Sequence, residues 1–412
     1  MKKQLLIVLV FLTSIPMFAG GYRVALQGAR MLGMGHAGTA MFSNAEALFF
    51  NPAASAYLEG DFQTTFGMSL VMSKVKYQNP EYLWTAETDN PLGTPFYAYA
   101  SFKHSEHLYM GFALYTPFGS SLKWEDGWKG AHLVNSISLK AIYFQPSLTW
   151  KINEYFAVSA GFIAAWGSVV YNKDLNRFLS DEEGNKTDIT LDASGITGSG
   201  YVLSVLIRPA DWVSMGVNYR SKVLFNARYG KAEINDAPAY FTTTKDAFSA
   251  TLPMPAELSV GIALKPLKKM TVAFDVNYTY WSVYKSLDID FKTALPDNSM
   301  PKNWKNTLTY RIGTEYALND KLALRAGYFA DNSPIPATYF SPETPSTDSD
   351  NFTFGFTYNY KKYAFDFAFL YVKGHERTDS YDYYKEGLSA PKFEGQYIYN
   401  ALVPSFGFNV KL

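Results

Sequence analysis

The 412-residue sequence contains no cysteine, which excludes a disulfide framework, a thiolate metal site and a lipid-modified N-terminal cysteine. It also carries no net charge, because 37 basic residues balance 37 acidic ones, and this balance gives no reason to expect nucleic acid as a partner. Beyond residue 19, no apolar run approaches the roughly 20 residues that a membrane-spanning helix needs. The chain is therefore not held in a membrane by helices.

Aromatic residues are abundant, at 17% of the sequence, with 31 Tyr and 31 Phe against only 8 Trp. This content is heavy for a soluble globular protein, in which large rings must find room in a core. It suits a membrane β-barrel, whose outer wall and interfacial girdles are aromatic.

Residues 1–19 have the features of a secretory signal peptide. Lys2 and Lys3 form a basic end, residues 5–12 form an apolar run, and Ala19 provides a small residue for cleavage. The alternative, a transmembrane anchor, would need a longer apolar run. We therefore expect an exported protein that is cleaved after Ala19.

Most of the remaining sequence alternates with a period of two. In 352–360, 363–371 and 272–280, aromatic and aliphatic residues occupy one face and small or polar residues the other. This pattern is typical of strands with lipid on one side and water or protein on the other. About fourteen such strands are predicted, at 61–75, 94–103, 107–116, 137–151, 155–171, 189–208, 211–229, 247–265, 268–283, 304–317, 320–330, 350–360, 362–373 and 397–411.

The predicted connections alternate strictly between short turns and long polar loops. An outer-membrane barrel has this layout, with short periplasmic turns and long outer loops, whereas a soluble sandwich has no reason for it. Residues 59–412 are therefore predicted to form an all-β, transmembrane antiparallel barrel of about fourteen strands. The long loops fall at 76–93, 117–136, 172–188, 230–246, 284–303, 331–349 and 374–396.

Residues 20–58 differ from the rest, being rich in Gly and Ala and almost free of strand-like alternation. Gly33, Gly35 and Gly38 match a G-x-G-x-x-G pattern, but a dinucleotide site would need a strand before it and a βαβ unit around it. Glycine also permits tight turns and close backbone approach, as a segment threaded through a lumen requires. We therefore predict that 20–58 form a hatch that plugs the barrel.

The hatch also carries a resemblance to a known family. The opening 19–22, the glycine series and the closing Asn51, Pro52 and Ala53 resemble the hatch of the FadL-like long-chain fatty acid transporters of Gram-negative outer membranes. The resemblance continues over essentially the whole mature chain. It implies ligand capture at outer loops, a pocket between hatch and wall, and lateral exit through a kinked third strand, in the bacterial outer membrane.

Further positions are singled out by this resemblance. Phe118, Trp124 and Trp128 look like the family's long second outer loop, where the hydrophobic ligand docks, although they could instead be interfacial anchors. Gly111, in the third predicted strand, is a candidate for the kink, since glycine favours bulges and bends.

Alternation places some charges in the lumen, because a charge facing lipid at mid-membrane would cost about 2–4 kcal/mol. Arg311, Glu315 and Arg325 are the clearest cases. These charges could pair with each other or with the hatch, which we favour. Alternatively, Arg311 or Arg325 could meet a ligand carboxylate.

No catalytic constellation, phosphate loop or metal pair is evident, since the five histidines are scattered without H-x-x-x-H or H-E-x-x-H spacing. We therefore expect no enzyme and no cofactor, but a passive transporter. Its predicted partners are a hydrophobic ligand, outer-membrane lipid and lipopolysaccharide, and the barrel assembly machinery, with the protein a monomer. Aromatic-hydrocarbon uptake and a nonspecific or structural barrel are the alternatives. The C-terminal Leu412 departs from the aromatic residue usual in such barrels.

Overall fold

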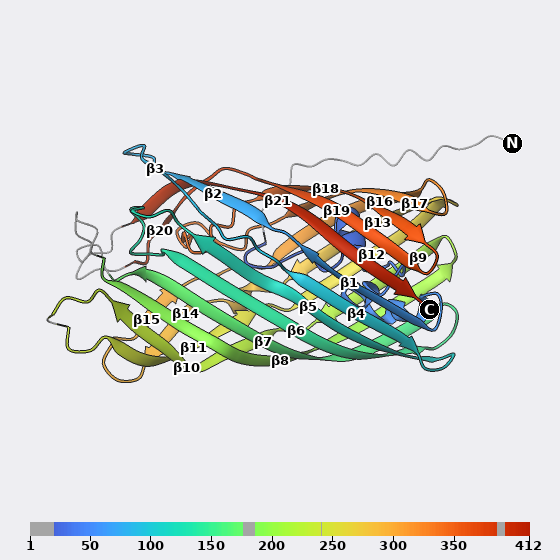
Figure 1. The fold of residues 1–412 in the computed structure, drawn as a ribbon, viewed down its shortest axis with the longest axis horizontal. Coiled ribbons are helices and arrows are strands. Elements are labelled where there is room, and N and C mark those ends of the chain that lie inside the picture. Colours follow the sequence, from blue (N-terminus) through green and yellow to red (C-terminus); the bar gives the residue numbers. More distant parts are fainter. Residues whose placement is uncertain (1–19, 176–185, 240, 385–391) are drawn as a thin grey trace.

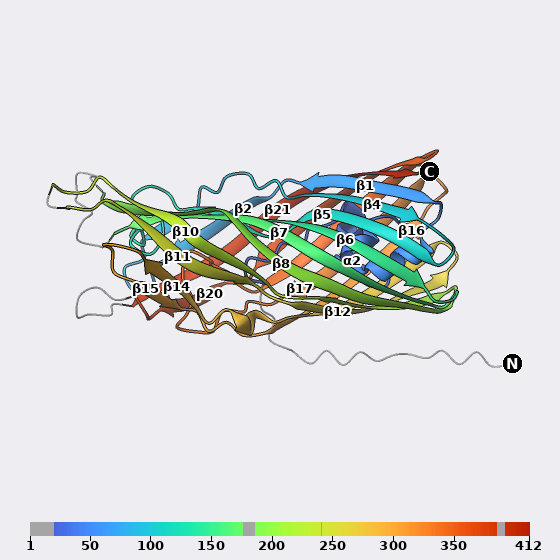
Figure 2. The ribbon, with the colours of Figure 1, turned by 90° about the horizontal axis from the view of Figure 1, so that it is seen from below.

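The computed structural model describes residues 20–175, 186–239, 241–384 and 392–412. Residues 1–19, predicted as a signal peptide, lie outside this described part. The strands run obliquely along an elongated, closed antiparallel barrel (Figures 1 and 2). Among the described residues, no helix is both long and apolar enough to cross a membrane.

Fourteen strands form a closed ring, as the sequence predicts, because each pairs with the next and the last pairs with the first. Thr65 of the first strand lies opposite Asn409 of the last strand and opposite Tyr99 of the second. A closed ring leaves no strand edge unpaired, which a sheet in lipid requires. The ring strands are β1 (Phe62–Ser69), β4 (Phe96–Lys103), β5 (Leu108–Lys123), β6 (Ser136–Lys151), β7 (Phe156–Asp174), β8 (Asp188–Ala210), β9 (Val213–Arg220), β12 (Glu257–Leu267), β13 (Met270–Thr279), β16 (Thr307–Ala317), β17 (Leu322–Asp331), β18 (Ser349–Tyr360), β19 (Tyr363–Gly374) and β21 (Phe393–Lys411).

The other strands extend the wall at one end of the barrel, at the left of Figure 1. The sequence predicted long polar loops in much of this region. That prediction is corrected, because three of those loops, 76–93, 284–303 and 374–396, contain strands of their own. The predicted strands at 61–75, 211–229 and 247–265 are each interrupted and form two strands. The additional strands are β2 (Met72–Gln78), β3 (Thr85–Glu87), β10 (Val223–Asn235), β11 (Lys245–Met254), β14 (Ser286–Phe291), β15 (Asn298–Pro301) and β20 (Arg377–Tyr381).

The alternation predicted from sequence determines which side chains face outward. On β18, Phe352 and Phe354 are about half exposed on the outer surface, whereas Thr353 and Thr357 are buried toward the lumen. Aromatic side chains of neighbouring strands pack together on the outer face, as between Phe356 and Phe367, whose ring centroids lie 5.5 Å apart. This aromatic exterior is the surface that meets lipid in the outer membrane.

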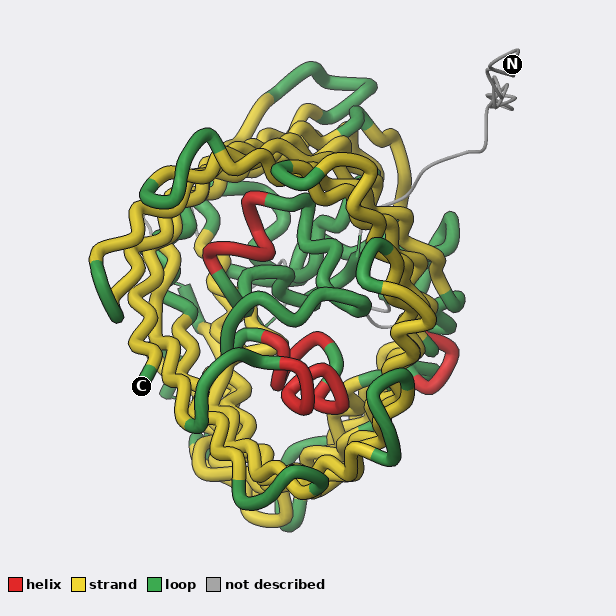
Figure 3. The backbone as a smooth tube through the Cα atoms, turned by 90° about the vertical axis from the view of Figure 1, so that its right-hand side faces the viewer, coloured by secondary structure: helices red, strands yellow, loops and turns green. Residues whose placement is uncertain are grey.

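The hatch, residues 20–58, lies inside the ring of strands (Figure 3). It contains α1 (Ala29–Gly33), α2 (Ala47–Phe50) and the 3-10 helix η1 (Pro52–Tyr57), and most of its residues are buried. A second short 3-10 helix, η3 (Trp281–Val283), follows β13 where the sequence predicted the end of a strand. The hatch is continuous with β1 through residues 59–61, so the plug and the wall are adjacent in the sequence.

Candidate functional site

Gly35 brings the hatch backbone into direct contact with the wall. It has φ +64°, and an added Cβ would lie 2.6 Å from the carbonyl oxygen of Ile312 and 2.9 Å from the nitrogen of Tyr328. The wall is equally bare there, because a Cβ on Gly313 or Gly327 would lie within 2.1 Å of the hatch backbone. Glycine on both sides is therefore required for this approach.

The other two predicted hatch glycines play different parts. A Cβ on Gly33 would lie 3.3 Å from the Cα of Gly355 on β18, so this position also approaches the wall. A Cβ on Gly38 would lie 2.5 Å from the ring of Phe50, within the hatch itself. The missing side chain at Gly38 therefore serves packing within the hatch.

Asn51 ties two parts of the hatch to the wall with one side chain. Its Nδ2 donates to the carbonyl oxygens of Thr39, 2.8 Å away, and Val205 of β8, 2.9 Å away. Its Oδ1 accepts from the backbone N–H of Ala53 at 3.1 Å and so caps η1. Pro52 is the first residue of η1, where its missing N–H costs nothing.

Asp275 on β13 was not singled out as a site residue, although the alternation of 272–280 places it on the lumen face. Its Oδ2 accepts three hydrogen bonds from the hatch: from the N–H groups of Gly38 and Thr39, both at 2.9 Å, and from the Thr39 hydroxyl at 2.7 Å. A carboxylate that accepts several such bonds is a strong anchor. The sequence therefore predicts that Asp275 faces the lumen, but it does not predict that Gly38 and Thr39 bind it.

Arg325 lies in a buried cluster of charges between hatch and wall. Its Nε donates to Glu315 Oε2 at 2.6 Å, and its Nη1 lies 3.5 Å from Asp366 Oδ1. Arg30 of the hatch binds the other oxygen of Glu315 at 2.7 Å. Glu46 accepts from the N–H of Arg30 at 3.2 Å, near the start of α1. Arg325 therefore pairs with Glu315 on the wall, and the hatch reaches the same carboxylate through Arg30.

A second charged cluster surrounds a small polar cavity. Arg23 of the hatch binds Glu257 at 3.1 Å and Asp331 at 2.8 Å, and Arg220 binds Glu257 at 3.4 Å. Arg311, which also lines this cavity, donates from Nε to Asn277 at 2.6 Å, and its guanidinium lies 4.7 Å from the Phe329 ring centroid. Arg311 forms no ion pair within 4.0 Å among the described residues.

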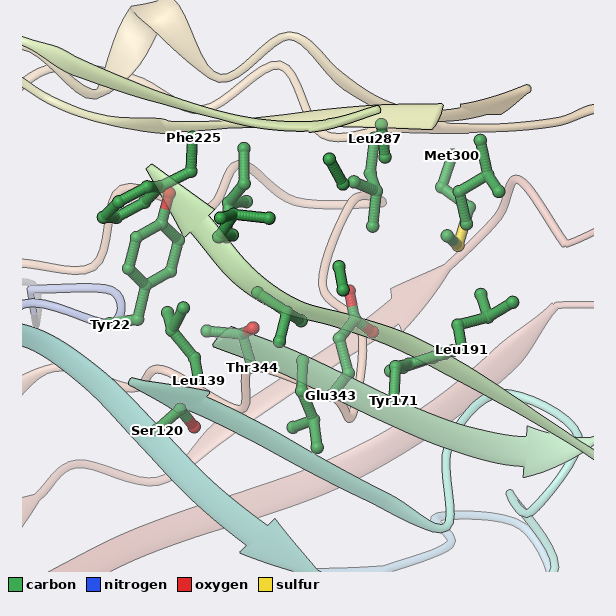
Figure 4. Close-up of a pocket in the computed structure, with 18 of the residues that line it drawn as sticks. Tyr22, Ser120, Leu139, Tyr171, Leu191, Phe225, Leu287, Met300, Glu343 and Thr344 are labelled. Carbon is green, nitrogen blue, oxygen red and sulfur yellow. The ribbon is translucent and has the colours of Figure 1, made fainter. Parts of the chain in front are cut away.

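A larger cavity lies in the lumen between the hatch and the end of the barrel that carries the additional strands. Its empty volume is about 870 Å³ (Figure 4). Tyr22 of the hatch forms part of its wall and donates its hydroxyl to the carbonyl oxygen of Pro253 at 2.6 Å. Burial raises the pKa of Tyr284, and the nearby Glu343 carboxylate raises it further, so this lining phenol stays neutral. The lining residues are Tyr22, Ser120, Ile137, Leu139, Val169, Tyr171, Leu191, Ala193, Ile196, Phe225, Ala227, Phe248, Ala250, Leu252, Tyr284, Leu287, Ile289, Met300, Glu343 and Thr344.

The residues predicted for ligand capture lie near this cavity, but none of the three lines it. Phe118 contacts Tyr22, with ring centroids 6.1 Å apart. Trp124 and Trp128 stack face to face with centroids 4.1 Å apart, and both are buried within the protein and not exposed on the lipid-facing surface. The sequence did not mark this lining, because alternation shows which strand positions face inward but not which of them surround a cavity. Leu287, Ile289 and Met300 lie in β14 and β15, within the predicted loop 284–303.

The bulge in β5 lies beside the cavity, but not where the sequence suggested. The register with β6 shifts between Tyr115 and Phe118, whereas Gly111 remains paired with Ser101 and Ser147. The predicted kink at Gly111 is therefore wrong. That position has another reason to be glycine, because a Cβ there would lie 2.2 Å from the side chain of Leu48 in the hatch.

Beyond this bulge, the hatch pairs with β5 like an added strand. The N–H of Val24 donates to the carbonyl oxygen of Pro117 at 2.9 Å, and the N–H of Gly119 donates to that of Tyr22 at 3.0 Å. Arg23 and Phe118 therefore lie directly opposite each other. Tyr22, which lines the cavity, thus belongs to a short extended segment that pairs with the edge of β5.

Comparisons with known proteins agree with this architecture. Residues 9–411 match the family model described as outer membrane protein transport protein (OMPP1/FadL/TodX). An outer membrane protein of Neisseria meningitidis serogroup B is 25% identical over 451 residues, with 96% of each chain covered. The structure of a FadL homologue from Pseudomonas aeruginosa superposes with a TM-score of 0.83 at 18% identity, covering 95% of this chain and all of that one. The P. putida toluene transporter TodX gives 0.73 at 15% identity, with 96% and 99% covered. The chain therefore belongs to the FadL/TodX family of outer-membrane transport proteins for hydrophobic compounds.

Proposed function

We propose that this protein admits long-chain fatty acids or similar hydrophobic small molecules by passive, ligand-gated diffusion. The ligand is captured among the outer loops, enters the apolar cavity and leaves sideways through the wall past the hatch. The observation that carries this proposal is the pairing of Tyr22–Val24 with the edge of β5 at its bulge, beside the cavity that Tyr22 helps to line. A ligand that displaces this short strand would free the edge of β5.

Physical chemistry supports a sheltered route. Burying one methylene group is worth about 0.8 kcal/mol, so an extended acyl chain resists passage through a water-filled pore. The apolar cavity replaces water around the ligand, and the filled lumen beneath it opposes leakage of polar solutes. Gly33, Gly35, Gly38, Asn51, Pro52 and Ala53 would hold the hatch while its N-terminal strand moves.

Uptake of monoaromatic hydrocarbons is a second candidate, favoured by the aromatic and aliphatic lining of the same cavity. A nonspecific porin is less consistent with a lumen occupied by a buried hatch. In either transport role, outer-membrane lipid and lipopolysaccharide would surround the aromatic exterior, the barrel assembly machinery would insert the chain, and a monomer would suffice.

A disulfide between positions 23 and 118 tests lateral release. The chain has no cysteine of its own, and opposed residues of an antiparallel pair lie within the roughly 4.4–6.8 Å Cα separation that a disulfide needs. The double variant Arg23→Cys, Phe118→Cys should take up radiolabelled oleate or toluene into cells or liposomes when reduced and lose that uptake when oxidised. The reduced form is the matched control. Equal uptake in both states would contradict release past this edge.

A further inference from the structure

The charge of the cavity lining is uneven. Among the described residues that line it, Glu343 is the one charged side chain, and the hydroxyls of Ser120, Thr344 and the lining tyrosines supply most of the other polar groups. Figure 4 shows Glu343 between Thr344 and Tyr171, with Leu287 and Met300 above it and Leu191 to the right. The cavity therefore presents to an occupant hydroxyl groups, which can donate or accept hydrogen bonds, and one carboxylate.

Glu343 is paired with a cation, Lys302, that is not part of the cavity lining. Lys302 Nζ forms an ion pair with Glu343 Oε1, and the Lys302 side chain is 3% exposed. Its ammonium group also lies 5.5 Å from the ring centroid of Tyr381. Lys302 is thus committed to Glu343 and does not line the cavity.

The buried arginines belong to a different space. Arg23, Arg220 and Arg311 line the polar cavity between hatch and wall, not the apolar one above it. An occupant of the apolar cavity therefore meets no guanidinium or ammonium group among the described lining residues.

An ionised carboxylate in this cavity finds no free counter-charge, because Lys302 does not line the cavity and is already paired with Glu343. The one charged group that it meets in the lining is therefore a carboxylate. Removing an ion from water is costly unless it is paired, and repulsion by the Glu343 carboxylate in an apolar cavity adds to that cost. An uncharged chain incurs neither penalty and still gains from burial.

We infer that the apolar cavity selects uncharged ligands, namely hydrocarbons, alcohols, esters or the protonated form of a fatty acid, and that Glu343 is the residue that rejects the carboxylate ion. This inference rests on the proposed function, because it assigns the substrate class of the same cavity. A fatty acid then enters the cavity as the neutral acid.

Two probes with the same chain length test this selectivity. Protein in lipid nanodiscs is loaded with the neutral fluorophore N-phenyl-1-naphthylamine, which is then displaced at pH 8 by 1-dodecanol or by dodecanoate. At this pH a free carboxyl group is ionised. Dodecanol should displace the fluorophore at a free concentration roughly tenfold lower than dodecanoate does. The apparent affinity of dodecanoate should increase as the pH falls toward 4. Dodecanoate that binds as tightly as dodecanol at pH 8 would overturn the inference.

Glu343→Gln assigns the effect to its residue. The variant removes the repulsion and frees Lys302, so dodecanoate should bind roughly tenfold more tightly while dodecanol changes less than about twofold. The double variant Lys302→Met, Glu343→Gln removes both charges and should give dodecanoate an intermediate affinity. Glu81→Gln, at an exposed position away from the lining, is the matched control and should leave both affinities unchanged.

The outcomes separate the two proposals. Displacement by neither probe in the wild type would contradict the proposed function itself, and with it the inference. Displacement by both with equal affinity would leave the function standing and remove the selectivity. Unchanged dodecanoate binding in Glu343→Gln would show that Glu343 does not reject the anion. If that variant fails to fold, the pH series on the wild type remains decisive.

Discussion

The lumen has two regions whose chemistry contrasts. Around the hatch, β13, β16 and β17 present Asp275, Arg311, Glu315 and Arg325. There the hatch is held by hydrogen bonds, ion pairs and glycine-to-backbone approaches as well as by apolar packing. Above the hatch, β6–β8, β10 and β11 present aliphatic and aromatic side chains around an empty volume of about 870 Å³. One continuous barrel wall therefore holds a plug in one region and leaves space in the other.

Under the proposed function the two regions serve different purposes, since the polar one holds the hatch and the apolar one receives the ligand. Charge-assisted hydrogen bonds fix orientation, and each contributes about 1.5–3 kcal/mol. The apolar cavity makes no such directional contacts, and its shape and lining are those of a site for a hydrophobic molecule.

Removing the hatch, which fills the polar region, should have the largest effect. Deletion of residues 22–50 should leave a barrel that still inserts, because the ring strands satisfy their own hydrogen bonds. In planar bilayers the wild type should be nearly silent, whereas the deletion should give steady conductance steps larger by about an order of magnitude or more. Hydrophobic uptake should be lost. A wild type that already conducts like an open porin would indicate a general diffusion pore.

Gly35→Val should loosen the hatch without unfolding the barrel. A β-branched residue at φ +64° with a Cβ 2.6 Å from a wall carbonyl should cost the hatch about 1–3 kcal/mol. Hydrogen exchange should accelerate in residues 29–41 and not in the ring strands. Gly127→Val is the matched control, because Gly127 also has a positive φ but its Cβ would meet nothing within 4 Å. Equal acceleration in the hatch for both variants would rule out the wall contact as the cause.

Filling the apolar region should affect the ligand and not the hatch. Ala250→Phe places a ring in the cavity and should reduce uptake roughly tenfold, while hatch hydrogen exchange stays unchanged. Ala160→Phe adds the same ring at an exposed position of β7 and should leave uptake intact. Similar uptake by the two variants would show that the cavity is not on the route.

Asp275→Asn should have the smallest effect, because asparagine keeps one acceptor oxygen and loses only the charge. The free energy that holds the hatch against the wall should fall by about 1 kcal/mol. Hydrogen exchange at Gly38 and Thr39 should then be a few-fold faster. Asp290→Asn, at an exposed position on β14, should change nothing there. A change equal to that of Gly35→Val would mean that Asp275 does more than accept these bonds.

The sequence predicted the ring well because alternation is a local signal. The lumen positions of Asp275, Arg311, Arg325 and Asp366 follow from their neighbours being aromatic or aliphatic, as the membrane demands. The fourteen ring strands follow from the same rule. What alternation cannot supply is the partner across the lumen, since Arg30 and Glu315 are 285 positions apart.

The apolar cavity was less predictable for a related reason. Glu343 and Lys302 lie in connections without periodicity, so no local pattern marks them as buried or paired. Gly111 shows the same limit from the other side. Glycine in a strand indicates either a bend or a close approach, and only the position of Leu48 in the hatch separates the two.

The seam of the barrel has a consequence for the order of assembly. The last residue of the chain exchanges backbone hydrogen bonds with the first residue of β1, since the N–H of Leu412 donates to the carbonyl oxygen of Phe62 at 2.9 Å and that of Phe62 returns the bond at 3.3 Å. The ring therefore cannot close until β21, which follows the other thirteen ring strands in the sequence, has been synthesised and exported. The hatch precedes β1 directly, so it remains attached to the first of the two strands that close the ring. Closure of the last strand on the first then encloses the plug in the same step, and no later threading is needed.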